Sequence, residues 1–354
     1  MKENNVTIDD WDWCIDDESR LVPWFRIFRE VEEKFTVKSD DTTCIFKVKD
    51  SSQRSYLVKH FSPNSIKEHL IAFFSSKAQN IYDSSQLLHR CGIPCAEYPG
   101  WAKNGTESMV LSVEIPDTVT ALEYWFRTVT HNSALRREFV SNLAKLVTSC
   151  AAASLSLPKL SLEHILVKNN GSAMFIVNPH DVDRMEGGLS ASARLRLLSP
   201  FLELRGEVSP ENMSIALLEA GFCDNSVDVT EVIHEEIDKI EEEIEDNSWP
   251  DYAEHVLNGE SGPLCRVIRN GDDVLRVRNT IWYSEMPVPD DSNSIAETIG
   301  EDDAERIWID SFKAQLLRHH CPRIPLSWEQ KADGHNIIRY ASTYDDILAC
   351  GFNQ

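Results

Sequence analysis

Two runs of residues near the start of the chain alternate between apolar and polar side chains. Residues 44–49 read Cys-Ile-Phe-Lys-Val-Lys, residues 55–61 read Ser-Tyr-Leu-Val-Lys-His-Phe, and residues 50–54 between them are polar. Alternation with a period of two is typical of β-strands, and the polar segment predicts a turn that joins them. Residues 109–115 form a further apolar run, which predicts another strand.

Longer segments place apolar residues every three or four positions, as amphipathic helices do. Residues 64–91 and 135–153 have this period, and Gly92 follows the first segment as a helix stop signal. Residues 121–126 predict a short helix between them. Strands therefore dominate the first hundred residues, and helices become more frequent after them.

Residues 228–246 combine an apolar stripe with strong negative charge. Ten of these nineteen residues are acidic, yet six apolar residues fall on one side of a helix: Val229, Val232, Ile233, Ile237, Ile240 and Ile244. We expect an amphipathic helix here rather than disorder. Its acidic face is either solvated, with the helix packed on its own domain, or a docking surface for a basic partner.

Length and charge narrow the class of protein. A chain of 354 residues is long enough for two domains with cores of their own. A net charge of −23 argues against nucleic acid or an anionic membrane as a main partner. Nine cysteines without a Cys-x-x-Cys pair fit a reducing compartment. With no export signal and no apolar run that could form a transmembrane segment, the sequence predicts a cytoplasmic protein.

Residues 155–184 carry the strongest candidate for chemistry. Two short apolar runs, 165–168 and 174–177, flank Asn169-Asn170-Gly171, which is a typical turn sequence for a β-hairpin. A polar loop precedes the hairpin, and Asn178 follows its second strand. Kinase-like folds place a catalytic base and a metal ligand in this order, although an ordinary hairpin accounts for the same pattern.

The segment resembles the lipopolysaccharide kinase family, that is, the Kdo and core-heptose kinases that are distantly related to protein kinases. Core-heptose kinases read His-x-Asp-x-x-x-x-His-hydrophobic and then hydrophobic-Ile-Asp-Leu. His164-Ile165-Leu166 resembles the end of the first pattern, and Ile176-Val177-Asn178 stands at the second. Val58-Lys59-His60-Phe61 is similar to the Ile-Lys-Arg-Tyr of the family, which implies that Lys59 binds nucleotide phosphates. The alternative is that Lys59 is a solvated strand residue.

The chain departs from the family at the positions that carry chemistry. Lys159 stands at the place of the catalytic base, Leu157 at that of the preceding His, and Asn178 at that of the metal-binding Asp. An ammonium group cannot accept a proton, and an amide is a weaker ligand than a carboxylate for magnesium. Residues 34–43, before the first strand pair, contain no glycine for a phosphate-binding loop.

The resemblance implies an α+β fold of the protein-kinase type, with a small antiparallel sheet lobe and a helical lobe. We place this domain at residues 21–205, after an acidic, loop-like tail at 1–20 that is anchored by Trp11 and Trp13. An acidic helical connector follows at 206–260. Residues 261–354 then form a second, partial copy of the sheet lobe.

The second copy is inferred from repeated order. Residues 265–269, a turn at Asn270-Gly271 and residues 274–278 resemble the first strand pair, so that Arg278 takes the place of Lys59 and Pro325 that of Pro94. Residues 290–303 are expected to be an acidic loop and 304–321 a helix. Residues 336–340 match the strand at 109–115, and 344–348 the short helix after it.

Three functions remain open at this stage. The first is a catalytically impaired kinase-fold protein, or pseudokinase, that acts by binding or regulating a protein partner. The second is an active kinase that uses ATP and magnesium to phosphorylate Kdo or heptose of a lipopolysaccharide precursor. It would hold phosphates with Lys59, and Asp181 or Asp183 would replace Asn178 as metal ligand, with His164 assisting and Glu163 as the nearest acid. The third is a scaffold that binds no nucleotide.

Overall fold

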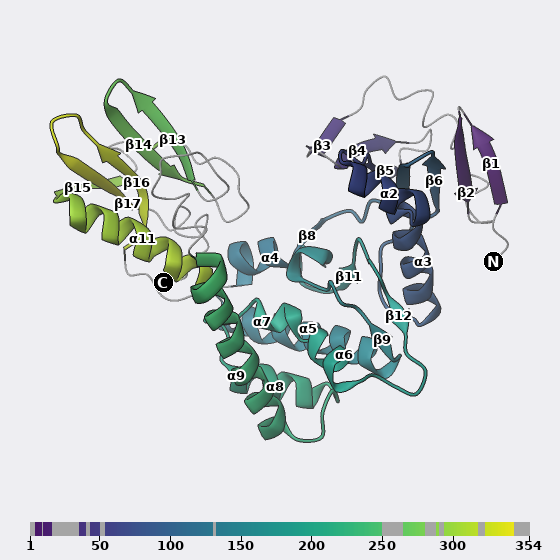
Figure 1. Cartoon of the computed structure of the whole chain (residues 1–354). Helices are drawn as coiled ribbons and strands as arrows, with labels where there is room; N and C mark the ends of the chain where they lie inside the picture. The colour runs from purple at the N-terminus through teal and green to yellow at the C-terminus, as the bar shows by residue number, and fades with distance from the viewer. Residues whose placement is uncertain are drawn as a thin grey trace. The chain divides into compact units, whose positions relative to one another are not determined.

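The fold is described from a computed structural model of the chain. It describes residues 4–8, 10–15, 35–39, 43–49, 54–129, 132–249, 265–279, 288–289, 294–317 and 323–342. The chain divides into two compact units (Figure 1). The first comprises residues 1–125, 134–203 and 219–222, and the second comprises 126–133, 204–218 and 223–354. Both units mix helices with sheets, so the α+β class is confirmed.

The first unit contains a seven-stranded antiparallel sheet. Its order is β1-β2-β6-β7-β5-β4-β3. The expected strand pair at 44–49 and 55–61 is confirmed as β4 and β5, and the strand at 109–115 as β7. The bounds are β1 Asn4–Ile8, β2 Trp11–Ile15, β3 Phe35–Ser39, β4 Thr43–Lys49, β5 Ser55–Phe61, β6 Gly100–Asn104 and β7 Glu107–Val113.

The N-terminal segment is not a loop-like tail. Strands β1 and β2 form a hairpin, and β2 pairs with β6, which extends the sheet. Trp13 and Ile15 are buried in the core of this sheet, and Trp11 packs against that core. The expectation of a loop was wrong because the acidic residues hid an alternating pattern, in which Trp11, Trp13 and Ile15 occupy every second position of β2.

Two helices separate β5 from β6. The single helical region expected at 64–91 is α2 (Ile66–Phe74) followed by α3 (Lys77–Arg90). Ser76 caps the second helix by accepting a hydrogen bond from the backbone N–H of Gln79. Gly92, with φ of +72°, follows α3, and the N–H of Ile93 returns to the carbonyl of Leu88 at 3.0 Å. This is the glycine-terminated helix end that the sequence predicts.

A more helical region follows the sheet, in which residues 134–203 belong to the first unit and residues 126–133 to the second. The hairpin at residues 165–177 is confirmed as β10 and β11, and β10 also pairs with β8. The elements in chain order are β8 Thr118–Thr120, α4 Ala121–Tyr124, a π-helix Trp125–Val129, α5 Ser133–Ala152, β9 Leu155–Ser156, a 3₁₀-helix Leu162–His164, β10 Ile165–Lys168, β11 Met174–Ile176, β12 Asp183–Arg184, α6 Ala191–Arg196 and α7 Ser199–Leu202.

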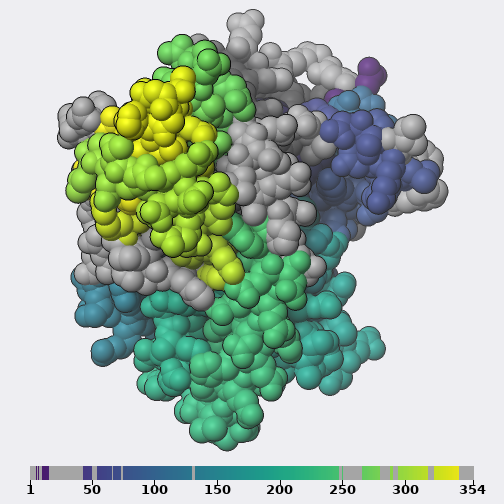
Figure 2. All heavy atoms as spheres, turned by 60° about the vertical axis from the view of Figure 1, so that its left-hand side comes forward, coloured from purple at the N-terminus to yellow at the C-terminus, as the bar shows by residue number. Residues whose placement is uncertain are grey.

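The second unit begins with helices and ends in a five-stranded antiparallel sheet. The acidic helix is confirmed as α9 (Ser226–Glu243), although Ile233 is its one buried residue. In Figure 2 the green residues of α9 form part of the visible surface. The other elements are α8 Pro210–Glu219, a π-helix Ile244–Ser248, β13 Cys265–Asn270, β14 Asp273–Arg278, β15 Ser294–Ile299, α11 Glu301–Leu317, β16 Pro325–Gln330 and β17 Asn336–Ala341.

The core of this unit lies between α11 and the sheet. Ala304, Trp308 and Phe312 are four residues apart, and all are fully buried against Trp328 and Ile338 of the sheet. The spacing of four places them on one face of α11, which covers the strands in Figure 1.

The second sheet shares a strand order with the first, but not in the way the sequence suggests. Its order is β13-β14-β16-β17-β15, and every neighbouring pair is antiparallel. Five strands of the first sheet, β1-β2-β6-β7-β5, have the same order and the same pairing. A helical segment joins β5 to β6 in one sheet, and α11 joins β15 to β16 in the other. Hairpin β13–β14 therefore corresponds to β1–β2.

Three expectations about the repeat need correction. Residues 290–303 are not a loop throughout, since they include strand β15 and the start of α11. Arg278 belongs to β14, the counterpart of β2, and so does not take the place of Lys59. Pro325 begins β16, whereas Pro94 precedes β6 by six residues. The pattern misled because strand alternation with a polar turn is common to all hairpins. Residues 344–348 lie outside the described residues.

Arg278 joins helix α11 to the sheet of the second unit. Its side chain is fully buried, and its guanidinium lies 3.7 Å from the ring centroid of Phe312. It donates to the carbonyl of Pro325 at 2.9 Å and to the side chains of Gln315 and Ser311. A buried guanidinium with these acceptors fixes α11 against β14 and β16.

Within the part of the chain that the structure describes, no helix combines the length and the apolar character needed to cross a membrane.

Candidate functional site

The loop after β9 and the end of β11 meet at one place in the first unit. The N–H of Val177 donates to the carbonyl of His164 at 2.8 Å, and the N–H of Ile176 donates to the carbonyl of Pro94 at 2.9 Å. The imidazole Nδ1 of His164 donates to the carbonyl of Lys159 at 2.7 Å. These hydrogen bonds bring the loop, the hairpin and the segment after α3 together. A small hollow lies there, lined by residues of the loop and of the segment that ends the hairpin, among them Lys159, His164 and Asn178.

Lys159, which lines this hollow, forms an ion pair with Asp181. The Lys159 ammonium lies 2.6 Å from Oδ2 of Asp181, and both side chains are about half exposed. The hydrogen bond from Lys159 is the main cause that lowers the pKa of the Asp181 carboxyl group below its ordinary value. Lys159 is thus paired with an acid from the segment that follows β11.

Helix α3 holds the backbone and side chain of Asp181. The amide of Asn80 donates to Oδ1 of Asp181 at 3.0 Å and accepts from the Asp181 N–H at 2.8 Å. One turn further along α3, Ser84 Oγ accepts from the N–H of Val182 at 3.3 Å. Asp181 itself has φ of +54°, which is uncommon for a residue with a side chain. The segment after β11 is therefore fixed to α3 by local contacts.

His180 lies among the charged groups of the site. The pKa of His180 is lowered to about 4, mainly because the imidazole is buried; Lys59, Lys159 and His164 act in the same direction, and Asp181 opposes them. His180 is neutral at pH 7.

The remaining sequence-predicted residues have distinct places. Asn178 has φ of +48°, and its N–H donates to the hydroxyl of the buried Tyr98 at 2.8 Å. Lys59 is half-buried on β5, with its ammonium 5.2 Å from the ring centroid of Phe61. Asp183 is exposed in β12, where it pairs with Ser156. The structure brings Lys159, His164 and Asn178 together with His180 around one small hollow. Asp181 is paired with Lys159, whereas the ammonium of Lys59 lies over the ring of Phe61.

The donor set does not suit a magnesium ion. Magnesium prefers oxygen ligands with uncompensated negative charge. The Asp181 carboxylate already accepts from an ammonium and an amide, Asn178 is neutral, and Lys159 adds positive charge nearby. Among the described residues, no group of three or more His, Cys, Asp or Glu side chains is arranged to hold a metal ion.

Sequence reasoning missed Asn80, Ser84, Tyr98 and His180. Asn80 and Ser84 are polar residues four positions apart on α3, and this spacing places them on one face of the helix. Two polar residues on one helix face indicate a polar partner for that face. The partners are Asp181 and Val182, about a hundred residues later in the chain. The spacing of polar residues on a helix does not reveal which distant segment they contact.

Comparisons with known proteins give weak likenesses. No protein-family model and no curated protein sequence matches the chain. The chain is similar to the solved structure of WaaP in complex with acyl carrier protein, with 14% identity and a TM-score of 0.47, over 67% of this chain and 98% of that chain. It is also similar to the autoinhibited serine kinase domain of the giant muscle protein titin, with 11% identity and a TM-score of 0.36, over 57% of this chain and 74% of that chain.

Proposed function

We propose that this chain is a kinase-fold protein that binds but does not transfer phosphate, and so acts as a pseudokinase of the lipopolysaccharide kinase type. The observation that supports this proposal best is the 2.6 Å ion pair between Lys159 and Asp181. This ion pair joins the loop of Lys159, which the resemblance aligns with the catalytic base, to the segment after Asn178, which it aligns with the metal ligand.

The order of elements agrees with the proposed fold. Lys59 lies on a central strand, α3 follows it, and α5 leads through the loop containing Lys159 into hairpin β10–β11. Helix α3 contacts the segment after β11 through Asn80 and Ser84. A kinase active site needs these same parts, namely a phosphate-binding lysine on a strand, a helix beside it, and a loop and hairpin that face both.

The charges at the site oppose phosphoryl transfer. Transfer to a sugar hydroxyl needs an acceptor for the hydroxyl proton, and a carboxylate with magnesium to neutralise the developing charge. Lys159 is a proton donor, and it neutralises Asp181. Glu163, the acid nearest in sequence, belongs to the 3₁₀-helix before β10. The alternative of an active Kdo or heptose kinase therefore lacks a proton acceptor at the place that its motif requires.

The same charges suit a phosphate group without a metal. Lys59 and Lys159 contribute positive charge to the surroundings of His180 and Asp181 contributes negative charge, so these three groups together are net positive and favour an anion. We propose that the phosphates of ATP bind here and that magnesium adds nothing to the affinity. The scaffold alternative predicts no binding. A protein partner and a cytoplasmic location remain predictions from the sequence.

The test combines binding and transfer by the full chain. Calorimetric titration with ATP, in EDTA and in magnesium, should give similar dissociation constants. Labelled ATP with lipopolysaccharide core acceptors should give no labelled product. Lys59→Met should weaken ATP binding by about 1–3 kcal/mol, the range for hydrogen bonds to charged groups, and Lys145→Met on the exposed side of α5 should not. Phosphate transfer that Lys59→Met abolishes and Lys145→Met preserves would show an active kinase instead.

A further inference from the structure

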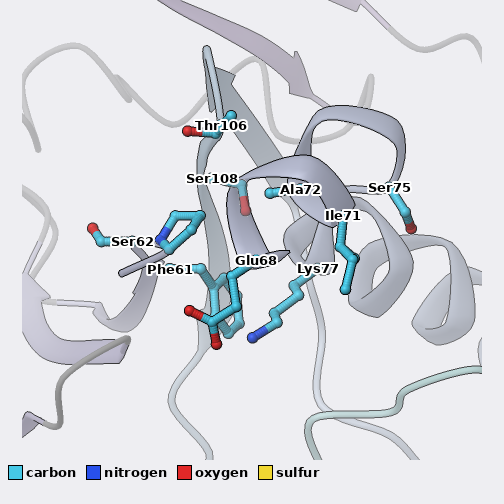
Figure 3. Close-up of a pocket in the computed structure, with 10 residues that line it drawn as sticks. Phe61, Ser62, Glu68, Ile71, Ala72, Ser75, Lys77, Thr106 and Ser108 are labelled. Carbon is cyan, nitrogen blue, oxygen red and sulfur yellow. The ribbon is translucent and has the colours of Figure 1, made fainter. Parts of the chain in front are cut away.

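A second hollow in the first unit shares no lining residue with the hollow beside His180. Its volume is about 200 Å³, and it lies between the end of β5, helix α2, the start of α3 and the β6–β7 hairpin (Figure 3). His69 of α2 is hydrogen-bonded to Thr106 of that hairpin at 2.9 Å, which joins two sides of the hollow.

The wall of this hollow is largely apolar. Phe61, Pro63, Ile71 and Ala72 supply ring or hydrocarbon atoms, and the other uncharged lining residues are serines and a threonine. Pockets for small molecules have this character, in which apolar walls give affinity and a few polar groups fix the orientation of the ligand. A cavity of roughly 150 Å³ binds benzene, so the volume here accommodates one aromatic ring or one branched hydrocarbon side chain.

One carboxylate and one ammonium group stand together at the mouth. Figure 3 shows Glu68 of α2 and Lys77 of α3 next to each other at one side of the opening. Glu68 Oε2 accepts from the N–H of Asn64 at 3.1 Å, which is the main cause that lowers the pKa of its carboxyl group, and the charge of Lys77 acts in the same direction. The Lys77 ammonium lies 5.9 Å from the ring centroid of Phe61. Both signs of charge are therefore present beside an aromatic part of the wall.

We propose that this hollow binds an α-amino acid that has a large apolar side chain. An α-amino acid carries an ammonium and a carboxylate group on one carbon atom, so it presents both charges to the mouth together. Its ammonium group donates to the Glu68 carboxylate, its carboxylate accepts from Lys77, and its side chain enters the apolar interior.

The paired charges at the mouth discriminate against other small apolar ligands. An amine or a carboxylic acid of the same size is attracted by one of the two groups and repelled by the other. An uncharged hydrocarbon displaces water from both groups and offers them no hydrogen bonds. This inference is independent of the proposed function, because it uses none of the residues that line the hollow beside His180.

The first experiment is calorimetric titration of the full chain without nucleotide. Leucine or phenylalanine should bind saturably. 3-Methylbutylamine, which is leucine without its carboxylate, should bind at least about tenfold more weakly, because a hydrogen bond to a charged group is lost. 4-Methylpentanoic acid, which is leucine without its ammonium group, should show a similar loss. Glycine, which has no side chain to fill the interior, should not bind measurably.

The second experiment changes the two charged residues and the interior. Lys77→Met and Glu68→Gln should each weaken the binding of leucine at least about tenfold. Glutamine also suits the third position of a helix, so Glu68→Gln retains a capping residue for α2. Lys67→Met, at an exposed residue of α2 outside the lining, should leave binding unchanged and is the matched control. Ala72→Leu and the smaller Ala72→Val fill the interior and should also weaken binding.

Circular dichroism checks that each variant is folded. Three results would overturn the proposal. The first is that neither leucine nor phenylalanine binds the full chain. The second is that the amine or the acid binds as tightly as leucine. The third is that Lys77→Met and Glu68→Gln, or both Ala72 variants, leave the dissociation constant of leucine unchanged.

Discussion

Asp181 has two kinds of partner, and they are not equal in energy. Its ion pair with Lys159 is about half exposed, and exposed pairs contribute about 0–1 kcal/mol because water screens them and both side chains lose freedom. Asn80 instead makes two hydrogen bonds with the same residue, one to its side chain and one from its backbone. The position of Asp181 therefore depends more on α3 than on the opposite charge.

This difference is measurable in urea unfolding of the full chain. We expect Asn80→Ala to reduce the free energy of unfolding by about 1–2 kcal/mol, since two hydrogen bonds are lost. We expect Lys159→Met to change it by less than about 1 kcal/mol. Asn142→Ala is a control for the general cost of losing an amide, since Asn142 donates to the carbonyl of Gly171 at 3.3 Å and accepts from the exposed Lys145 at 3.5 Å. A larger loss from Lys159→Met than from Asn80→Ala would contradict this ranking.

The lowered pKa of His180 predicts a loss of stability in mild acid. The unfolded chain binds a proton at His180 near pH 6.5, while the folded chain binds it near pH 4. The contribution of His180 to the free energy of unfolding is therefore fully present above pH 6.5. It is lost as the pH falls from 6.5 to 4, and the free energy of unfolding decreases by at most about 1.4 kcal/mol per pH unit. The pKa of Asp181 is lowered too, so its contribution disappears only below its ordinary value of 3.8. His180→Gln should flatten urea-derived stability between pH 6.5 and 4.5, and an unchanged slope would assign that dependence to other groups.

At the level of elements, hairpin β10–β11 depends on one glycine. Gly171 has φ of +74°, and a Cβ atom there would lie 2.8 Å from the hydroxyl oxygen of Tyr124. The turn thus requires both a left-handed backbone and a close approach to α4.

Gly171→Ala should lower the free energy of unfolding by about 1–3 kcal/mol, because strain at this φ adds to the collision with Tyr124. In the Tyr124→Phe background the same substitution should cost less, since the colliding oxygen is gone. Gly105→Ala, at φ of +59° in the β6–β7 turn with open space around its Cβ, measures the backbone cost alone. Equal costs for Gly171→Ala in both backgrounds would show that the Tyr124 contact is unimportant.

The sequence predicted local elements well and their partners poorly. Strands β4, β5, β7, β10 and β11 follow from alternation, and α5 follows from its apolar period, because these patterns are set by residues close in the chain. Strands β2 and β15 were missed, since acidic residues in and around them resemble a loop. The correspondence between sheets was misassigned because pairing between distant strands leaves no short-range signal. Lys159 and Asn178 were identified because a local sequence motif points to their positions. The contact between Asn80 and Asp181 joins distant segments, and no local motif reveals it.

At the scale of the whole molecule, the two units have separate interiors. The first unit buries Leu143 and Val147 of α5 together with residues of its sheet, and the second buries Trp308 and Phe312 of α11 against its own strands. A compact unit with its own core can unfold as a cooperative body. The core cluster of the first sheet consists of strand residues, whereas that of the second sheet includes residues of α11.

Scanning calorimetry of the full chain should therefore show two unfolding transitions. Leu143→Ala removes a fully buried side chain from the first unit, and at a cost of about 2–5 kcal/mol it should lower one transition by several degrees. Trp308→Ala, at about 3–5 kcal/mol, should lower the other. Leu70→Ala, at a side chain that is 63% exposed, should shift neither and is the control. A single transition that both buried substitutions lower together would show instead that the two cores unfold as one cooperative body.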